Sequence, residues 1–208
     1  MKETIYTIPI NEAFEQQDGT CPVCRLREAL ERDALEYVMG AAMMEPDVRQ
    51  ETNRKGFCKR HLDGMMTMGN RLSLALIIES YLLEQAEHIK RYDPNSCFVC
   101  ERLDGFMAAY IRNIYHICEN DEKFVEKLQK SRLCYPHTGQ LLAGVDKNMK
   151  RKSAEDLRKL LVKMAGERLS ELTPLVSAFC KSFDHRFADL PLGDAKTAVE
   201  QTAAWLRP

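Results

Sequence analysis

The chain has 208 residues, of which 45% are hydrophobic and 29% charged, and its 30 basic and 31 acidic residues leave a net charge of -1. This balance excludes disordered and collagen-like chains. Near-neutral charge also argues against a general affinity for nucleic acid or anionic membrane, which needs many uncompensated Lys and Arg side chains. With only 10 Gly and 8 Pro, the composition favours helix over strand and predicts an all-α fold.

The chain shows no signal for export or membrane insertion. Its first residues, MKETIYTIPINEAFEQQ, contain no apolar stretch of signal-peptide length, and the most hydrophobic run, residues 72–83, is too short to span a bilayer. We therefore expect a cytoplasmic protein. Eight cysteines in a reducing compartment indicate metal binding or redox work rather than structural disulfides.

Two stretches of the chain repeat one pattern, C-x2-C-x33-C-x2-H, at an offset of 76 residues and without a gap. The first set is Cys21, Cys24, Cys58 and His61, and the second is Cys97, Cys100, Cys134 and His137. Few other positions match, as expected of an old duplication that kept its ligands. We expect repeat units 20–68 and 96–144 within a single domain, 1–208.

Each repeat is predicted to form a helical hairpin. Thr20 and Ser96 are suitable N-caps directly before a CxxC, and Gly40 is a suitable helix end. A second helix is expected to begin at Glu45-Pro46-Asp47 and to run from Asp47 to Lys55, and Asp121-Glu122 begins its counterpart in the second unit. About 14 helical residues outward from Arg25 cover about 21 Å, and the return to Cys58 covers about 13 Å of helix plus about 7 Å of extended chain, so each CxxH is expected beside the CxxC of its own unit. Pairing of one unit's CxxC with the other unit's CxxH stays open as an alternative.

Three thiolates and one imidazole make a closed tetrahedral donor set, which is typical of structural zinc. The start of a helix favours thiolate at a CxxC, because free N–H groups and the helix dipole stabilise negative charge there. Zinc with three thiolates is anionic, and basic residues lie near both motifs. These are Arg25, Lys59 and Arg60 in the first unit and Arg102 and Arg132 in the second. The pattern predicts two zinc ions per chain.

Other chemistry is less well supported by the pattern. A thioredoxin-like CxxC needs strands alternating with helices, which the sequence does not show. An iron-sulfur cluster is the alternative cofactor, because three Cys and one His can hold one. Cys118 and Cys180 are interpreted as buried small hydrophobic residues. No P-loop, G-x-G-x-x-G, G-x-S-x-G or H-E-x-x-H motif is present, so no catalytic residue is predicted and we do not expect an enzyme.

The remaining segments are expected to form the core. Residues 72–89 are apolar nearly all round in their first half, which predicts a central helix buried on several sides. Long C-terminal helices are predicted over 153–206, with a restart or kink at Pro174 and a cap at Asp194. The predicted fold class is therefore all-α, with duplicated metal-clasped helical hairpins packed with long C-terminal helices.

A resemblance to a known family rests on four motifs and on the apolar helix between the second and the third. The motifs are Cys21-Pro-Val-Cys24, Gly56-Phe57-Cys58-x2-His61, Cys97-x-Val-Cys100 and Leu133-Cys134-x2-His137. Over most of its length the chain resembles a bacterial family of domains of unknown function with duplicated cysteine-histidine motifs. The resemblance implies paired metal sites and adds no substrate or activity. Arg132 departs from the pattern, since the second unit has no glycine where the first has Gly56.

Two functions fit these features. We favour a non-catalytic, zinc-binding helical module that presents a surface to a protein partner, and an exposed apolar patch would support it. The alternative is a thiol redox or metal-responsive switch, in which oxidation of the CxxC thiols releases zinc. We expect neither membrane nor nucleic-acid binding.

Overall fold

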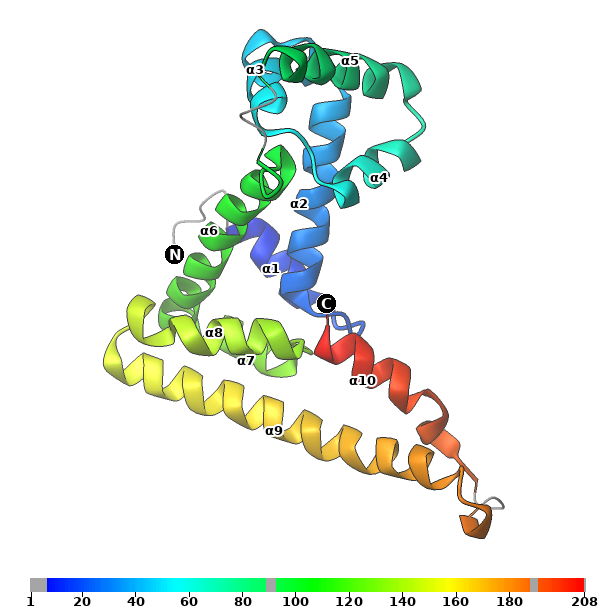
Figure 1. The fold of residues 1–208 in the computed structure, drawn as a ribbon. Helices are drawn as coiled ribbons and strands as arrows, with labels where there is room; N and C mark the ends of the chain where they lie inside the picture. Colours follow the sequence, from blue (N-terminus) through cyan, green and yellow to red (C-terminus); the bar gives the residue numbers. More distant parts are fainter. Residues whose placement is uncertain (1–6, 89–92, 188–190, 208) are drawn as a thin grey trace. The chain divides into compact units, whose positions relative to one another are not determined.

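The computed structural model describes residues 7–88, 93–187 and 191–207. These ranges contain helices and no strand (Figure 1), which confirms the all-α prediction. Among the described helices, none combines the length and the apolar character needed to cross a membrane.

The chain divides into two compact units. Unit 1 comprises Met1–Arg25 and Tyr110–Pro208, and unit 2 comprises Leu26–Ala109. The boundaries fall inside two helices, α2 (Pro22–Met39) and α6 (Phe98–Asn120), so unit 2 is an insertion in the sequence of unit 1. The prediction that residues 1–208 form a single domain stays a prediction.

Unit 1 is built from the two ends of the chain. Its elements, besides the ends of α2 and α6, are α1 (Thr7–Glu15), α7 (Glu122–Lys130), α8 (Tyr135–Asn148), α9 (Arg151–Lys181), the 3-10 turns η3 (His185–Phe187) and η4 (Gly193–Thr197), and α10 (Ala198–Leu206). The rings of Phe14 and Phe124 pack 4.9 Å apart and join α1 to α7. Helix α7 begins where predicted, since the Asp121 carboxylate accepts hydrogen bonds from the backbone N–H groups of Lys123 and Phe124.

The C-terminal part of unit 1 differs in detail from the prediction. Helix α9 continues through Pro174, so the helix does not restart there, and the alternative of a kink stays a prediction. Asp194 lies in the 3-10 turn η4, and the final helix begins one turn later at Ala198. Helix α9 packs against α8 and α10, and its buried residues Leu157, Leu161 and Leu172 belong to the predicted stripe.

Unit 2 contains most of α2 together with η1 (Ala41–Met44), α3 (Pro46–Lys55), α4 (Lys59–Thr67) and α5 (Arg71–His88). Helix α2 ends before Gly40 and α3 starts at Pro46, as the sequence predicts. Apolar side chains from α2, α4 and α5 form one cluster of the core. Its buried members are Val38, Met39, Met65, Leu74 and Ile77.

Helix α5 corrects the prediction of a central, buried helix. Only one face of α5 is covered, and Leu72, Leu82 and Leu83 expose 70%, 60% and 68% of their surface. Hydropathy alone predicted burial because it does not report whether a second element lies against the other face. Ile89, the last residue of the predicted helix, lies outside the described residues.

Candidate metal centres

The eight predicted ligands form two clusters, and each cluster takes one pair from each repeat. Site 1, in unit 1, consists of Cys21, Cys24, Cys134 and His137, and site 2, in unit 2, consists of Cys58, His61, Cys97 and Cys100. Within each site the donor atoms all lie within 4.8 Å of one another. The prediction that each hairpin closes on its own CxxC is therefore wrong, and the cross-repeat pairing that the sequence left open is observed.

Helix lengths explain this pairing. Helix α2 has 18 residues and α3 only 10, which correspond to about 27 Å and 15 Å at 1.5 Å per residue. In the second repeat α6 has 23 residues and α7 has 9, or about 35 Å and 14 Å. Each return helix thus covers about half of the outward helix or less. The CxxH that follows it stops well short of the CxxC at the start of its own repeat.

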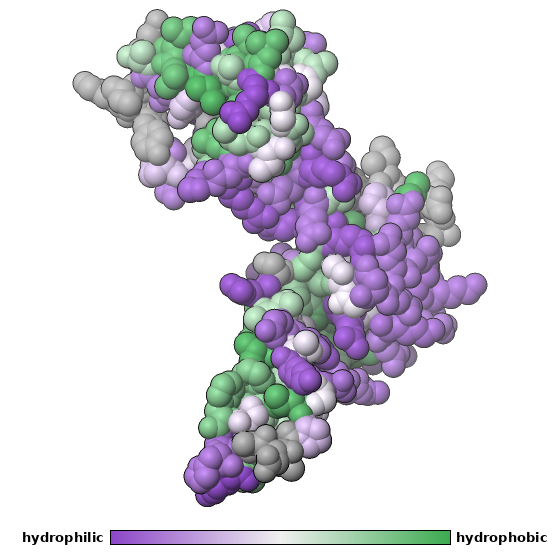
Figure 2. Space-filling view, turned by 90° about the vertical axis from the view of Figure 1, so that its right-hand side faces the viewer, coloured by the Kyte–Doolittle hydropathy of each residue, from purple (hydrophilic) through white to green (hydrophobic). Residues whose placement is uncertain are grey.

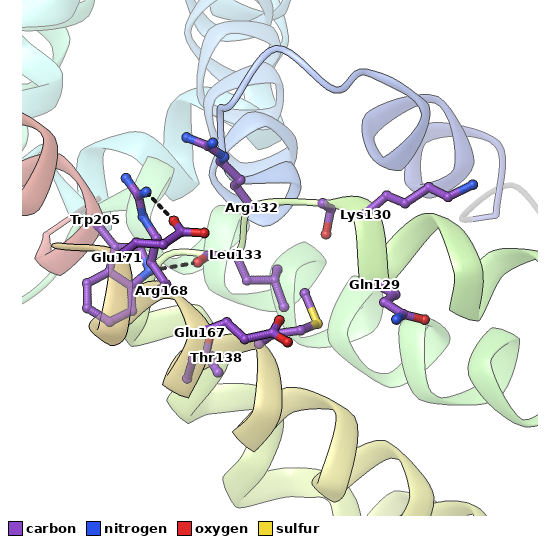
Figure 3. Close-up of a pocket in the computed structure, with 12 residues that line it drawn as sticks. Gln129, Lys130, Arg132, Leu133, Thr138, Glu167, Arg168, Glu171 and Trp205 are labelled. Atoms are coloured by element: carbon purple, nitrogen blue, oxygen red, sulfur yellow. Dashed lines mark hydrogen bonds and ion pairs between the residues drawn. The ribbon is translucent and has the colours of Figure 1, made fainter. Parts of the chain in front are cut away.

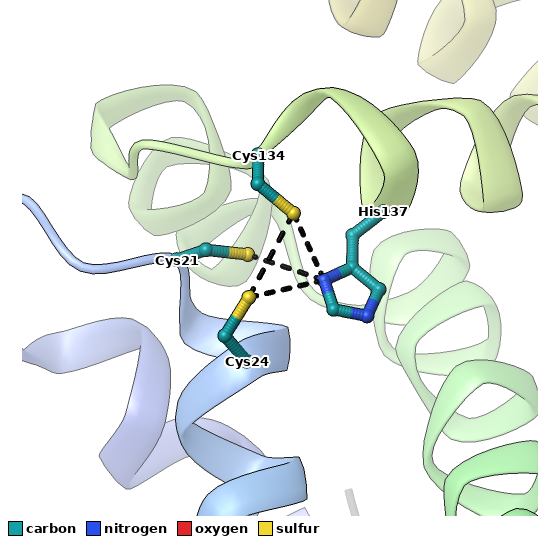
Figure 4. Close-up of side chains that lie close together, drawn as sticks. All are labelled: Cys21, Cys24, Cys134 and His137. Atoms are coloured by element: carbon teal, nitrogen blue, oxygen red, sulfur yellow. Dashed lines mark hydrogen bonds between the residues drawn. The ribbon is translucent and has the colours of Figure 1, made fainter. Parts of the chain in front are cut away.

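In site 1 the donors come from the first turns of two helices (Figure 4). The carbonyl of Cys21 accepts a hydrogen bond from the backbone N–H of Arg25 at 3.0 Å, so Cys21 caps α2, one residue after the predicted cap. Cys134 occupies the N-cap position of α8. His137 Nδ1 lies 3.0 Å from Cys134 Sγ, 3.4 Å from Cys24 Sγ and 3.6 Å from Cys21 Sγ.

Site 2 repeats this geometry with the two repeats exchanged. His61 Nδ1 lies 3.2 Å from the sulfurs of Cys58 and Cys97 and 3.5 Å from that of Cys100. Cys58 caps α4, and Cys97 is placed directly before α6. In both sites three sulfurs and Nδ1 of the imidazole therefore face a common centre.

The thiols of site 1 influence one another strongly. Hydrogen bonds from Cys134 and Cys24 lower the pKa of Cys21, while the neighbouring Cys134 and Cys21 raise the pKa of Cys24. Burial lowers the pKa of His137, but its contacts with Cys134 and Cys21 outweigh burial and raise it to about 9. Three thiolates cannot all be charged at this distance without a cation between them. A divalent cation at the common centre would supply that charge.

In site 2 burial and the neighbouring Cys97 raise the pKa of Cys100 to about 12. Burial also lowers the pKa of His61, against the opposing effect of the Glu31 carboxylate. This imidazole is therefore held neutral at pH 7, which is the form that a metal needs. The donor sets of both sites match the Cys₃His composition of structural zinc centres.

The backbone before each CxxH differs between the sites, and the difference explains why position 132 is not a glycine. Gly56 has φ +63°, and its carbonyl accepts a hydrogen bond from Phe98 N–H at 3.0 Å. In site 1 the residue corresponding to Phe98 at the offset of 76 is Pro22, which has no N–H to donate. Arg132 therefore does not need the conformation of Gly56, and no described non-glycine residue has a positive φ.

Site 1 has a different backbone support, which the sequence did not reveal. Trp205 Nε1 donates to the carbonyl of Leu133, directly before Cys134, at 3.0 Å. Trp205 and Leu133 also line a cavity of about 190 Å³ beside α9 (Figure 3). Arg168 at this cavity donates to Glu171 at 2.8 Å. The single tryptophan of the chain thus links α10 to the metal-binding segment.

Three of the five predicted basic residues pair with carboxylates. Arg25 pairs with Asp18 and Lys59 with Asp63, each on the surface. Arg60 pairs with Glu31 at 2.6 Å, and the same carboxylate lies 3.2 Å from His61 Nε2. Glu31 was missed because it stands within a run of charged residues on α2, and its counterpart at the offset of 76 is Met107.

The two cysteines outside the motifs stay outside both clusters. Cys118 is half-buried, and burial together with Asp121 raises its pKa to about 12. Cys180 is exposed, so the prediction of burial is wrong for this residue.

Comparison with known proteins gives a family and no function. No curated protein and no solved structure matched the chain. One family model, described as a family of unknown function (DUF6062), matches twice, over residues 1–94 and 91–208. One of the two cysteine-histidine repeats falls in each match. Since the two matches cover the whole chain, the protein belongs to the DUF6062 family.

Proposed function

We propose that both sites bind zinc and that the metal is structural. The observation that carries this proposal is the convergence of three sulfurs and one imidazole nitrogen within 4.8 Å, twice in one chain. Four protein donors complete a tetrahedron and leave no position for a substrate or an activated water. Each zinc would join segments that are distant in sequence, such as Cys24 and His137, which are 113 residues apart.

The metal content of the purified protein tests this proposal. We expect two zinc ions per chain, a colourless protein and a lower melting temperature after strong chelation, because metal binding contributes to the free energy of folding. Elemental analysis and native mass spectrometry of protein purified with and without oxygen would measure the content. A brown protein that contains iron and inorganic sulfide would contradict the zinc proposal and support the iron-sulfur alternative.

We further propose that the zinc-stabilised fold serves as a non-catalytic, cytoplasmic interaction module, and that its docking surface is the exposed face of α5. Figure 2 shows apolar side chains gathered at the upper end of the view, where unit 2 is drawn. Five exposed positions of α5 follow one another at alternating spacings of three and four residues, and together they are called the α5 seam. They are Leu72, Ala75, Glu79, Leu82 and Ala86. That spacing is typical of a seam between two helices.

Charge indicates the kind of helix that fits this α5 seam. Glu79 lies in the middle of the seam, exposed between Ala75 and Leu82. An amphipathic helix of a partner protein with Lys or Arg opposite Glu79 would pair this carboxylate and cover the leucines. The acidic residue also disfavours an anionic lipid surface.

Designed amphipathic helical peptides test the α5 seam directly. A peptide with a central Lys between apolar residues should bind the full chain, and the same peptide with Glu should bind less well. Leu82→Glu should abolish binding, whereas Val162→Glu, at an exposed apolar position on α9, should not. Fluorescence anisotropy measures the affinities. Equal binding of both peptides, or self-association of the chain through α5 in sedimentation experiments, would contradict this choice of partner.

The redox switch remains the second candidate because two thiols of site 2 are accessible in part. Cys58 and Cys100 are half-buried, and their sulfurs lie 3.9 Å apart. A peroxide could oxidise these two thiolates to a disulfide, with two protons taken up, two waters formed and the metal released. Zinc release at low peroxide excess, with loss of helicity, would favour this function over the structural one.

A further inference from the structure

His61 has one ring nitrogen that faces away from the cysteines of site 2. Its Nδ1 lies 3.2 Å from Cys58 Sγ and Cys97 Sγ, and its side chain is only 3% exposed. A neutral imidazole has one donor and one acceptor nitrogen. If Nδ1 gives its lone pair to a metal, Nε2 must carry the proton, and this buried N–H needs an acceptor.

Glu31 on α2 is placed to be that acceptor. Its Oε1 lies 3.2 Å from His61 Nε2, and its side chain is 15% exposed. The oxygen lies off the direction of the N–H, and Nε2 has no aligned hydrogen bond to any described residue. Arg60 binds the other carboxylate oxygen at 2.6 Å and holds the group beside the ring. The Glu31 carboxylate is thus the acceptor within reach of the Nε2–H of His61.

Within the described ranges, no ion pair joins His137 of site 1 to a carboxylate. At the repeat offset of 76, Met107 stands in place of Glu31 and Pro136 in place of Arg60. Among the described residues, the groups that raise the pKa of His137 most are the thiols of Cys134 and Cys21. Its second ring nitrogen points away from the cysteines in Figure 4. The carboxylate is thus a property of one site and not of the shared motif.

We propose that Glu31 is a positioning residue for site 2: it accepts the Nε2–H of His61, which fixes the tautomer and the ring orientation and strengthens Nδ1 as a metal ligand. This inference rests on the proposed function, because it requires that site 2 binds a metal. Carboxylates that orient ligating histidines typically change metal affinity by 10- to 100-fold. The effect is expected at site 2 alone.

Substitution of Glu31 in the full, zinc-loaded chain tests the proposal. Glu31→Ala should weaken zinc binding at site 2 by about 10- to 100-fold in competition with a chromogenic chelator. Glu31→Gln keeps an acceptor oxygen without the charge and should show a smaller loss. Glu28→Gln, at an exposed position on the same helix, is the control and should behave as wild type. Alkylation and mass spectrometry identify the emptied site, because Cys58, Cys97 and Cys100 become modifiable first.

Two further measurements separate orientation of the ligand from general stability. Nitrogen NMR of the His61 imidazole should show one tautomer with a protected Nε2–H in the wild type and in Glu28→Gln, and faster exchange of that proton in Glu31→Ala. Arg60→Ala breaks the surface ion pair but keeps the acceptor, so it should lose less affinity than Glu31→Ala. Equal zinc retention at site 2 in Glu31→Ala and Glu28→Gln, or an equal loss at both sites, would overturn the proposal. A wild-type chain without metal at site 2 would instead overturn the proposed function.

Discussion

Site 1 and site 2 each combine a CxxC pair with a CxxH pair, but very different lengths of chain separate the two pairs. In site 1 Cys24 and His137 are 113 residues apart, and the loop between them contains all of unit 2. In site 2 His61 and Cys100 are only 39 residues apart. Closing the longer loop costs about 1 kcal/mol more chain entropy when the site forms.

The groups around the donors differ as well. Site 2 has Glu31 beside His61 and a backbone hydrogen bond from Phe98 to Gly56, whereas site 1 has the indole of Trp205 on the Leu133 carbonyl. The duplication therefore preserved the ligands and not their support. Because Glu31 and Trp205 lie outside the motifs, each site can change its stability and metal affinity without losing a ligand.

The largest expected effect comes from removing one ligand of each site. Cys134→Ser should cost the metal of site 1 and Cys58→Ser the metal of site 2, and each loss should lower the melting temperature by about 10 °C, since a structural zinc contributes several kcal/mol. Native mass spectrometry and thermal unfolding measure both quantities.

The same variants test the cross-repeat pairing. In Cys134→Ser, Cys21 and Cys24 should react with an alkylating agent while Cys97 and Cys100 stay protected. Pairing within a repeat requires the opposite result, with Cys97 and Cys100 modified and Cys21 protected. Loss of both metals from either variant would show that the two sites are not independent.

A smaller effect on stability is expected from substitution of Gly56, because only site 2 has a glycine at this position. Gly56→Ala should destabilise the protein by about 2 kcal/mol, because the positive φ disfavours a side chain. An added Cβ would also lie 3.0 Å from the ring of Tyr81. Arg132→Ala, at the corresponding position of site 1, should change stability by no more than about 0.5 kcal/mol. Urea unfolding with zinc in excess measures both, and equal effects would contradict the different backbone roles of these positions.

The sequence predicted the local features of this fold better than its pairings. The starts of α3 and α7 follow from Pro46 and Asp121, because caps and first-turn residues act within a few residues. The exchange of ligands between repeats depends on the ratio of helix lengths, which an error of a few residues in each helix obscures. The exposure of α5 and the position of Glu31 depend on which elements pack together, and residue type alone does not determine that.

Substitution of Trp205 should lower the free energy of unfolding by about as much as the loss of one buried hydrogen bond beside site 1. Trp205→Phe keeps an aromatic ring beside Tyr135, whose ring centroid lies 5.2 Å away, but it leaves the Leu133 carbonyl without its donor. We expect a loss of about 1 to 3 kcal/mol in the free energy of unfolding. Metal release from site 1 should become faster and that from site 2 should not change. Equal acceleration at both sites, followed with a chromogenic chelator, would indicate general destabilisation instead.

The smallest effect concerns reactivity rather than stability, and it compares the clustered thiols with the two outside the motifs. The six clustered cysteines should resist alkylation while zinc is bound, because coordination occupies their lone pairs, and should react after chelation. Exposed Cys180 should react in both states. Cys118 should react in neither state at pH 8, because burial and Asp121 raise its pKa to about 12 and the thiolate forms only as the pH approaches that value. Mass spectrometry of the alkylated protein gives all eight rates in one experiment.

Rapid modification of Cys58 or Cys100 in the zinc-loaded protein, at the rate of Cys180, would show that site 2 is open to reagents while site 1 is closed. That result would favour a switch function for site 2.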